Sequence, residues 1–169
     1  MAVWQFVIDF VPEQFLLDTY SCIPATMLPE DRKKGGFFRQ TCLGINKLLP
    51  YLQPFGSYNK ASWDGTRLYQ GEAENDAVVY FNKETGMVKE VSCRIDVRQP
   101  YESFIYGIVT LATAFDCQLM ARGSKQLFAP TVSDLRLAME QSNAQKFIAD
   151  PLKFLTDLSK DDKATPPTA

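Results

Sequence analysis

Residues 87–98 constrain the fold more than any other segment, because polar and apolar residues alternate along them. One side of this run is apolar, with Val91, Cys93, Ile95 and Val97, and the other is polar, with Ser92, Arg94, Asp96 and Arg98. This two-residue period predicts a strand with one buried face, which is typical of antiparallel sheets. A second β-type run, residues 77–82, precedes it across a short loop that ends at Gly86, so the two runs predict a hairpin.

Helical signals follow this hairpin. From Tyr101 to Phe115, apolar residues recur at the spacing of one helix face, and Pro100 suits the first turn of that helix. Thr131-x-x-Asp134 resembles a capping box, and Asp150-Pro151 resembles an N-cap followed by proline at the first helical position. Between them, residues 117–129 predict a hairpin with a type II′ turn at Gly123-Ser124.

The remaining segments complete the prediction of fold class. Residues 3–10 alternate as a strand, residues 45–52 show helical spacing with a kink or restart at Pro50, and residues 57–69 are expected to form a loop. The order of elements predicts an α+β fold: a single domain over residues 1–159, with helices packed on an antiparallel sheet. Residues 160–169 lack large apolar side chains and are expected to be a disordered tail.

Composition limits the chemistry that is available. The chain has no histidine, which excludes Ser-His and Cys-His catalytic pairs and imidazole metal ligands. Its net charge of −2 does not suggest a nucleic-acid partner. The sequence therefore predicts a protein that is not an enzyme, with no catalytic residue, no metal ligand and no cofactor.

Targeting signals and cysteine spacing bear on the compartment. The first ten residues lack the charged and continuous apolar regions of a secretory signal, and no apolar run reaches the length of a membrane span. The four cysteines show no C-x-x-C spacing and are expected to be reduced core thiols. We expect a cytoplasmic protein without a membrane partner.

The charges on residues 94–98 have two interpretations. Arg94, Asp96 and Arg98 share one side of the predicted strand, about 7 Å apart in succession. They could form a site for an anion or carboxylate. They could equally form a ladder of alternating charges on the solvent face of the sheet.

A second group of candidates lies in residues 58–76. The carboxylates of Glu72, Glu74 and Asp76 could form a solvated acidic loop, a protein-binding patch or a cation site. The neighbouring loop mixes aromatic and polar groups of the kinds found at interface hot spots. The predicted partner-binding residues are Tyr58, Trp63, Asp64, Tyr69, Glu72, Glu74 and Asp76. Changing the three acidic residues 72, 74 and 76 to lysine is expected to weaken partner binding while stability stays nearly intact.

Two stretches carry a resemblance to a known class of proteins. These are residues 91–98 with the following helix and hairpin, and the pattern Ser142-x-Ala144-x-x-Phe147-x-x-Asp150-Pro151-x-x-Phe154-Leu155. Together they resemble small bacterial immunity proteins encoded beside polymorphic or type VI secretion toxins. The resemblance implies a cytoplasmic, non-catalytic inhibitor that binds its cognate toxin and blocks the toxin's active site or substrate access.

Two other classes of function stay open. The chain could be a ligand-sensing or scaffold domain that binds another subunit, or a hydrolase that uses paired carboxylates.

Overall fold

The computed structural model describes residues 2–28, 30–31, 36–59, 65–71, 74–99 and 101–161. Its strands are β1 (Gln5–Pro12), β2 (Ser57–Asn59), β3 (Thr66–Gln70), β4 (Asp76–Phe81), β5 (Val88–Asp96), β6 (Cys117–Ala121) and β7 (Leu127–Phe128). Its helices are α1 (Glu13–Tyr20), α3 (Ile45–Leu52), the 3₁₀ turn η1 (Gln53–Phe55), α4 (Glu102–Ala114), α5 (Val132–Glu140), α6 (Asn143–Ala149) and α7 (Pro151–Asp161).

The strands form one antiparallel sheet in the order β2-β3-β4-β5-β1-β6-β7. The first strand of the chain, β1, is inserted between β5 and β6, so it pairs with partners about 80 to 115 residues away along the chain, as in Phe6 with Ile95 and Ile8 with Ala121. The predicted hairpin of β4 and β5 is confirmed, and Gly86 has the positive φ, 69°, that its turn requires. The α+β fold with an antiparallel sheet in a single domain is confirmed.

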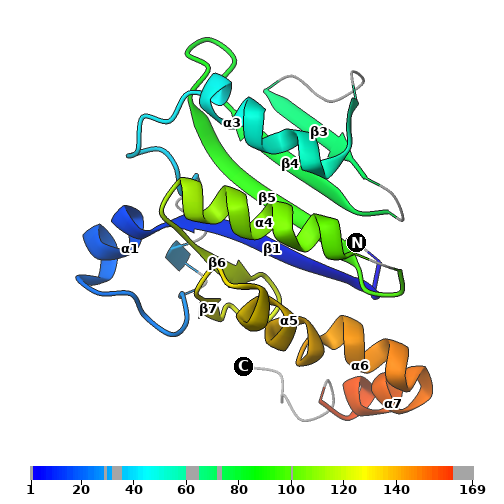
Figure 1. Cartoon of the computed structure of the whole chain (residues 1–169). Helices are drawn as coiled ribbons and strands as arrows, with labels where there is room; N and C mark the ends of the chain where they lie inside the picture. Colours follow the sequence, from blue (N-terminus) through cyan, green and yellow to red (C-terminus); the bar gives the residue numbers. More distant parts are fainter. Residues whose placement is uncertain are drawn as a thin grey trace.

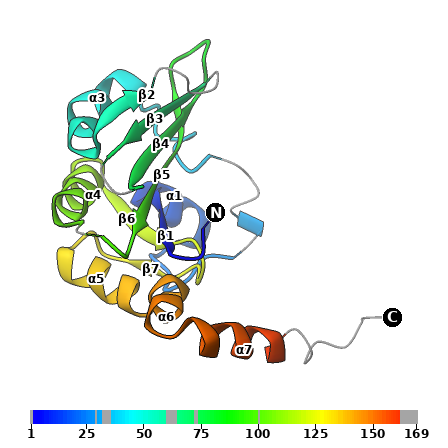
Figure 2. The ribbon, with the colours of Figure 1, turned by 90° about the vertical axis from the view of Figure 1, so that its right-hand side faces the viewer.

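One face of the sheet is apolar and is covered by helices. Phe6, Ile8 and Phe10 of β1 line up with Ile95 and Cys93 of β5 on this face, and all are buried. The helix α4 crosses the middle of the sheet in Figure 1, and Figure 2 shows α3, α4 and α5 along the same side. Gly107 permits the close packing of α4, because a β-carbon there would lie 3.3 Å from the ring of Phe55.

The other face of the sheet is polar at its centre. The strand register places Asp76, Arg94 and Val7 side by side across β4, β5 and β1, with Arg122 beyond them. Asp9, two residues along β1, accepts hydrogen bonds from Nε and Nη2 of Arg122, the first at 2.9 Å. Both predicted faces of residues 91–96 are therefore present, but the polar face is partly buried.

The caps predicted at Thr131 and Asp150 are confirmed, whereas Pro100, predicted in the first turn of the helix after β5, lies outside the described residues, and α4 begins at Glu102. The Thr131 hydroxyl accepts a hydrogen bond from the Asp134 N–H at 3.1 Å, and the Asp150 carboxylate accepts one from the Lys153 N–H at 2.9 Å. Pro50 lies within α3 without ending it, and the chain continues into η1.

Three local predictions are wrong. Residues 57–59 and 66–70 are strands, not a loop. The turn after β6 places Lys125, not Gly123, at positive φ (63°), so it is not a type II′ turn at Gly123-Ser124. Lys160 belongs to α7, which runs to Asp161, so the predicted tail begins too early; residues 162–169 lie outside the described part of the chain.

Candidate functional site

The most densely bonded polar group in the described chain lies where β1 begins, β4 begins and β5 ends. We call it the strand-end cluster, and it consists of Trp4, Gln5, Glu74, Asn75, Asp76, Arg94, Asp96 and Arg98. The antiparallel pairing of Gln5 with Asp96 and of Asp76 with Arg94 brings these three chain segments together.

Arg94 and Asp76 form a cross-strand ion pair. Nε of Arg94 donates to Oδ1 of Asp76 at 2.8 Å, and Nη2 donates to the other carboxylate oxygen. The Asp76 side chain is 7% exposed and that of Arg94 is 38% exposed. The hydrogen bond to Asp76 raises the pKa of Arg94, so the carboxylate is an internal counter-ion for this arginine.

Arg98 and Asp96 form a second pair at the end of β5. The backbone N–H and Nε of Arg98 donate to Oδ1 of Asp96 at 3.0 and 2.8 Å, and Nη2 donates to Oδ2 at 2.6 Å. These hydrogen bonds lower the pKa of the buried Asp96 carboxyl against the opposing effect of desolvation. Asp96 is therefore held in its ionised form.

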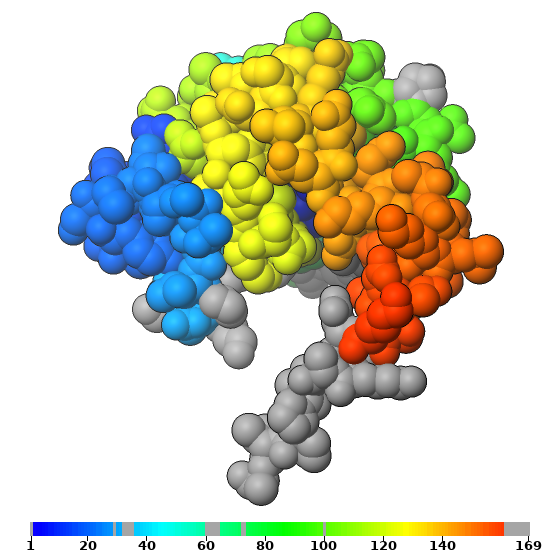
Figure 3. Space-filling view, turned by 90° about the horizontal axis from the view of Figure 1, so that it is seen from below, coloured from blue at the N-terminus to red at the C-terminus, as the bar shows by residue number. Residues whose placement is uncertain are grey.

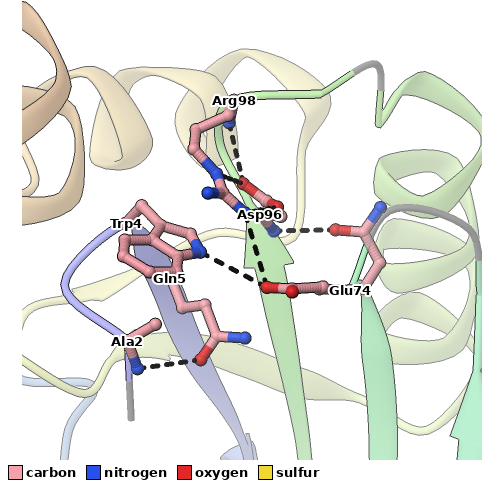
Figure 4. Close-up of polar contacts among 7 residues, drawn as sticks. Ala2, Trp4, Gln5, Glu74, Asp96 and Arg98 are labelled. Atoms are coloured by element: carbon pink, nitrogen blue, oxygen red, sulfur yellow. Dashed lines mark hydrogen bonds and ion pairs between the residues drawn. The ribbon is translucent and has the colours of Figure 1, made fainter.

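Trp4 and Glu74 lie beside this pair, and Figure 4 shows the hydrogen bonds that connect them. The Arg98 guanidinium carbon lies 4.2 Å from the centroid of the Trp4 ring, within the range of a cation–π interaction. The indole Nε1 of Trp4 donates to Oε2 of Glu74 at 3.3 Å, and Nη2 of Arg98 lies 3.4 Å from the same oxygen. The result is a surface group in which Trp4 is half-buried, Arg98 and Glu74 are exposed, and each side chain contacts the other two.

The turn between β3 and β4 is fastened to β5 at this cluster. The side-chain Oδ1 of Asn75 accepts a hydrogen bond from the Asp96 N–H at 2.7 Å, and Asn75 is buried. Glu74 adopts a left-handed conformation with φ of 59°. This buried amide and this turn geometry position the Glu74 carboxylate opposite Trp4 and Arg98.

A polar hollow of about 470 Å³ lies beside the cluster. Its lining includes Gln5, Gln70, Asn75 and the Asp76–Arg94 pair. Arg94 is paired with Asp76, and the other ionisable lining residue is the Glu74 carboxylate, so the lining offers an anionic ligand no unpaired cation. The arrangement favours the charge-ladder interpretation of residues 94–98 over the anion-site interpretation.

Of the predicted partner-binding residues that the structure describes, Tyr58 and Tyr69 lie together, apart from Glu74 and Asp76. Glu74 is exposed and belongs to the strand-end cluster, whereas Asp76 is buried in its ion pair, so it is not part of a solvated acidic loop. Tyr58 is exposed on the edge strand β2 beside Tyr69, which is buried on the helix-covered face of the sheet. Trp63, Asp64 and Glu72 lie outside the described residues.

The edge strand carries a smaller aromatic group. The rings of Tyr58 and Tyr69 are 5.7 Å apart, and the Arg67 guanidinium carbon lies 5.4 Å from the Tyr58 centroid. Tyr69 pairs with Ala77, so it points to the opposite side of the sheet from Asp76. The two groups therefore form separate surfaces.

The four cysteines are free thiols, two of them buried and two exposed. Cys93 and Cys117 are buried thiols, and desolvation raises the pKa of each. Cys22 and Cys42 are exposed, so the prediction that all four are core residues is wrong. Among the described residues, no group of three or more Cys, Asp or Glu side chains is arranged to hold a metal ion.

Trp4 and Arg98 are functional-site candidates that the sequence pattern does not place in one site. Both were assigned to strands by their alternation, and only the pairing of β1 with β5 shows that they touch. The signals in the sequence that could have indicated this site are a tryptophan just before β1 and an arginine just after β5.

No known family model matches the chain, and no curated protein or solved structure matches it either. In the described part of the chain, no helix has the length and apolar character needed to cross a membrane.

Proposed function

We propose that this protein neutralises a cognate bacterial toxin by binding it and blocking its active site or substrate access. The observation that carries the proposal is the surface group of the half-buried Trp4 with the exposed Arg98 and Glu74, held in place by the buried Asp96 and Asn75. Tryptophan and arginine dominate the binding energy of protein interfaces. Side chains that are already fixed lose little conformational entropy on binding.

The resemblance of residues 91–155 to immunity proteins supports the same function, and such a protein works without chemistry of its own. A stable complex needs about 800 Å² of complementary surface on each partner. The strand-end cluster is one part of such a surface.

The carboxylates of the cluster do not favour a hydrolase. A general acid needs a raised carboxyl pKa, whereas the arginine beside Asp96 lowers its pKa. Asp76 likewise has Arg94 as a bidentate partner. The paired arrangement suits a binding surface better than acid–base catalysis.

Co-purification with the product of the adjacent gene tests the proposal. We expect that product to be toxic when expressed alone, harmless when co-expressed with this chain, and to elute with it as one complex in size-exclusion chromatography. A product that is not toxic and forms no complex would overturn the proposal.

A ligand-sensing or scaffold domain is the second candidate, and α7 is the observation in its favour. Leu152, Leu155 and Leu158 of α7 are all exposed, as a docking helix requires. Self-association in light scattering, with no toxin recovered, would favour this candidate.

A further inference from the structure

A groove separates the start of β1 and the β6–β7 turn from the helices α6 and α7. It has a volume of about 840 Å³, within the range of pockets that hold ligands. Figure 3 shows the N-terminal segment (dark blue) at the bottom of a hollow between the yellow hairpin region and the orange α6. We call this feature the α7 groove.

The floor and one wall of the α7 groove are apolar. Val7, Ala121 and Ala144 are buried in its floor, and Leu155 and Leu158, half-exposed, line it from α7. Phe154 of α7 packs on Phe147 of α6, with ring centroids 5.8 Å apart, which attaches this wall to the domain. Val3, also exposed, lines the opposite side.

The charges at the α7 groove are of one sign. Its ionisable lining residues are Arg122 and Lys146, and no carboxylate is among them. Lys125 lies on the same turn as Arg122, since its Nζ donates to the Arg122 carbonyl at 3.1 Å. Arg122 is neutralised by Asp9, but among the described residues neither Lys125 nor Lys146 has an ion-pair partner.

An apolar groove with a basic rim is complementary to an amphipathic helix whose polar face is acidic. Such helices insert apolar side chains at i, i+3, i+4 and i+7 and keep their charged face at the rim. The leucines at positions 155 and 158 supply the i, i+3 ridge against which a second helix packs. We infer that the α7 groove binds an acidic amphipathic helix of a partner protein.

This inference goes beyond the proposed function, because it does not require the partner to be a toxin. The strand-end cluster and the α7 groove are adjacent, since Gln5 lines both the groove and the polar hollow. A partner could therefore contact both surfaces at once.

A model peptide tests the inference directly on the full chain. The probe is a fluorescein-labelled helical peptide of about four turns, with leucine at i, i+3, i+4 and i+7 and glutamate elsewhere. We expect saturable binding in fluorescence anisotropy, and at least about tenfold weaker binding of the same peptide with lysine in place of glutamate. Absence of saturable binding, or equal binding of the two peptides, would overturn the inference.

Two pairs of variants locate the binding. Leu155→Glu is expected to weaken binding of the glutamate peptide about tenfold or more, whereas Leu152→Glu, on the same helix but outside the groove and 80% exposed, leaves it unchanged. Lys146→Glu is expected to weaken it about threefold and to reduce its salt dependence, whereas Lys153→Glu does neither. Equal effects of the two variants within either pair would contradict binding of the peptide in the α7 groove.

A second copy of the chain is the competing occupant. Static light scattering of the wild-type chain and of Leu155→Glu distinguishes a second copy of the chain from a partner helix as the occupant of the groove. A wild-type dimer that becomes a monomer in the variant would overturn the inference, and a monomer in both supports it.

Discussion

The guanidinium of Arg98 lies over the indole ring of Trp4, 4.2 Å from its centroid, although 94 positions separate the two residues in the sequence. The contact exists because β1 pairs with β5 in the middle of the sheet, so that the beginning of one strand meets the end of the other. Asp96, two residues before Arg98, accepts hydrogen bonds from its guanidinium, and Glu74, from the turn before β4, lies beside both Trp4 and Arg98.

Replacing Trp4 tests whether this surface binds a partner. Trp4→Ala removes the aromatic face and the Glu74 hydrogen bond, and we expect the dissociation constant of the toxin complex to rise about tenfold or more. Isothermal titration calorimetry measures it. Tyr106→Ala, an exposed aromatic on α4, is the matched control and should change affinity little. Equal effects of the two substitutions would exclude Trp4 from the interface.

The lowered pKa of Asp96 predicts acid-dependent stability. Asp96 has a lower pKa in the folded protein than in the unfolded chain, where it is about 3.9, so its ionised form favours the folded state. This contribution is complete above about pH 5 and is lost as the pH falls through the folded-state pKa. Urea unfolding at several pH values should show wild type more stable than Asp96→Asn at pH 6, with the difference shrinking towards pH 3. A constant difference would contradict the shift.

The buried Asp9 predicts an asymmetry between single and double substitutions. Arg122→Met leaves the Asp9 carboxylate without its bidentate arginine, and we expect a loss of about 3 kcal/mol in the free energy of unfolding. The double substitution Asp9→Leu with Arg122→Met should lower the free energy of unfolding less than Arg122→Met alone, because it removes the buried carboxylate together with its arginine partner. Denaturant unfolding of the three proteins tests this, and a double variant that is the least stable of them would contradict it.

The acidic residues 74 and 76 should now respond differently to charge reversal. Glu74→Lys changes an exposed side chain, so we expect stability to fall by about 1 kcal/mol or less. Asp76→Lys places a second positive charge against Arg94 in a buried position, so we expect a loss of about 3 kcal/mol or more. The expectation that all three acidic residues could be reversed at little cost is therefore revised for Asp76. Thermal unfolding of both variants tests the difference, and similar melting temperatures would contradict it.

The sequence predicted those elements whose signals are local. The alternation of residues 91–96, the apolar face of α4 and the Thr131 cap each depend on neighbours within a few positions. The local pattern does not predict strands β2 and β3, because Tyr58, Arg67 and Tyr69 mix aromatic and polar groups without a clear period. The two strands are stabilised by pairing with each other and by contacts between their side chains.

The candidate site was harder to predict because it depends on register. Nothing in residues 3–10 indicates that β1 lies between β5 and β6, and without that position neither Trp4–Arg98 nor Asp9–Arg122 can be inferred. Asp76 was grouped with Glu72 and Glu74 as a candidate partner-binding residue because the three stand close together in sequence. Its cross-strand partner Arg94 reverses that assignment.

We propose that this protein acts by stoichiometric binding, and an inhibition titration measures that stoichiometry. The activity of the purified product of the adjacent gene is measured while this protein is added in increasing amounts. We predict that toxin activity falls linearly and is abolished near one equivalent. Undiminished activity at a large excess of this protein would contradict the account.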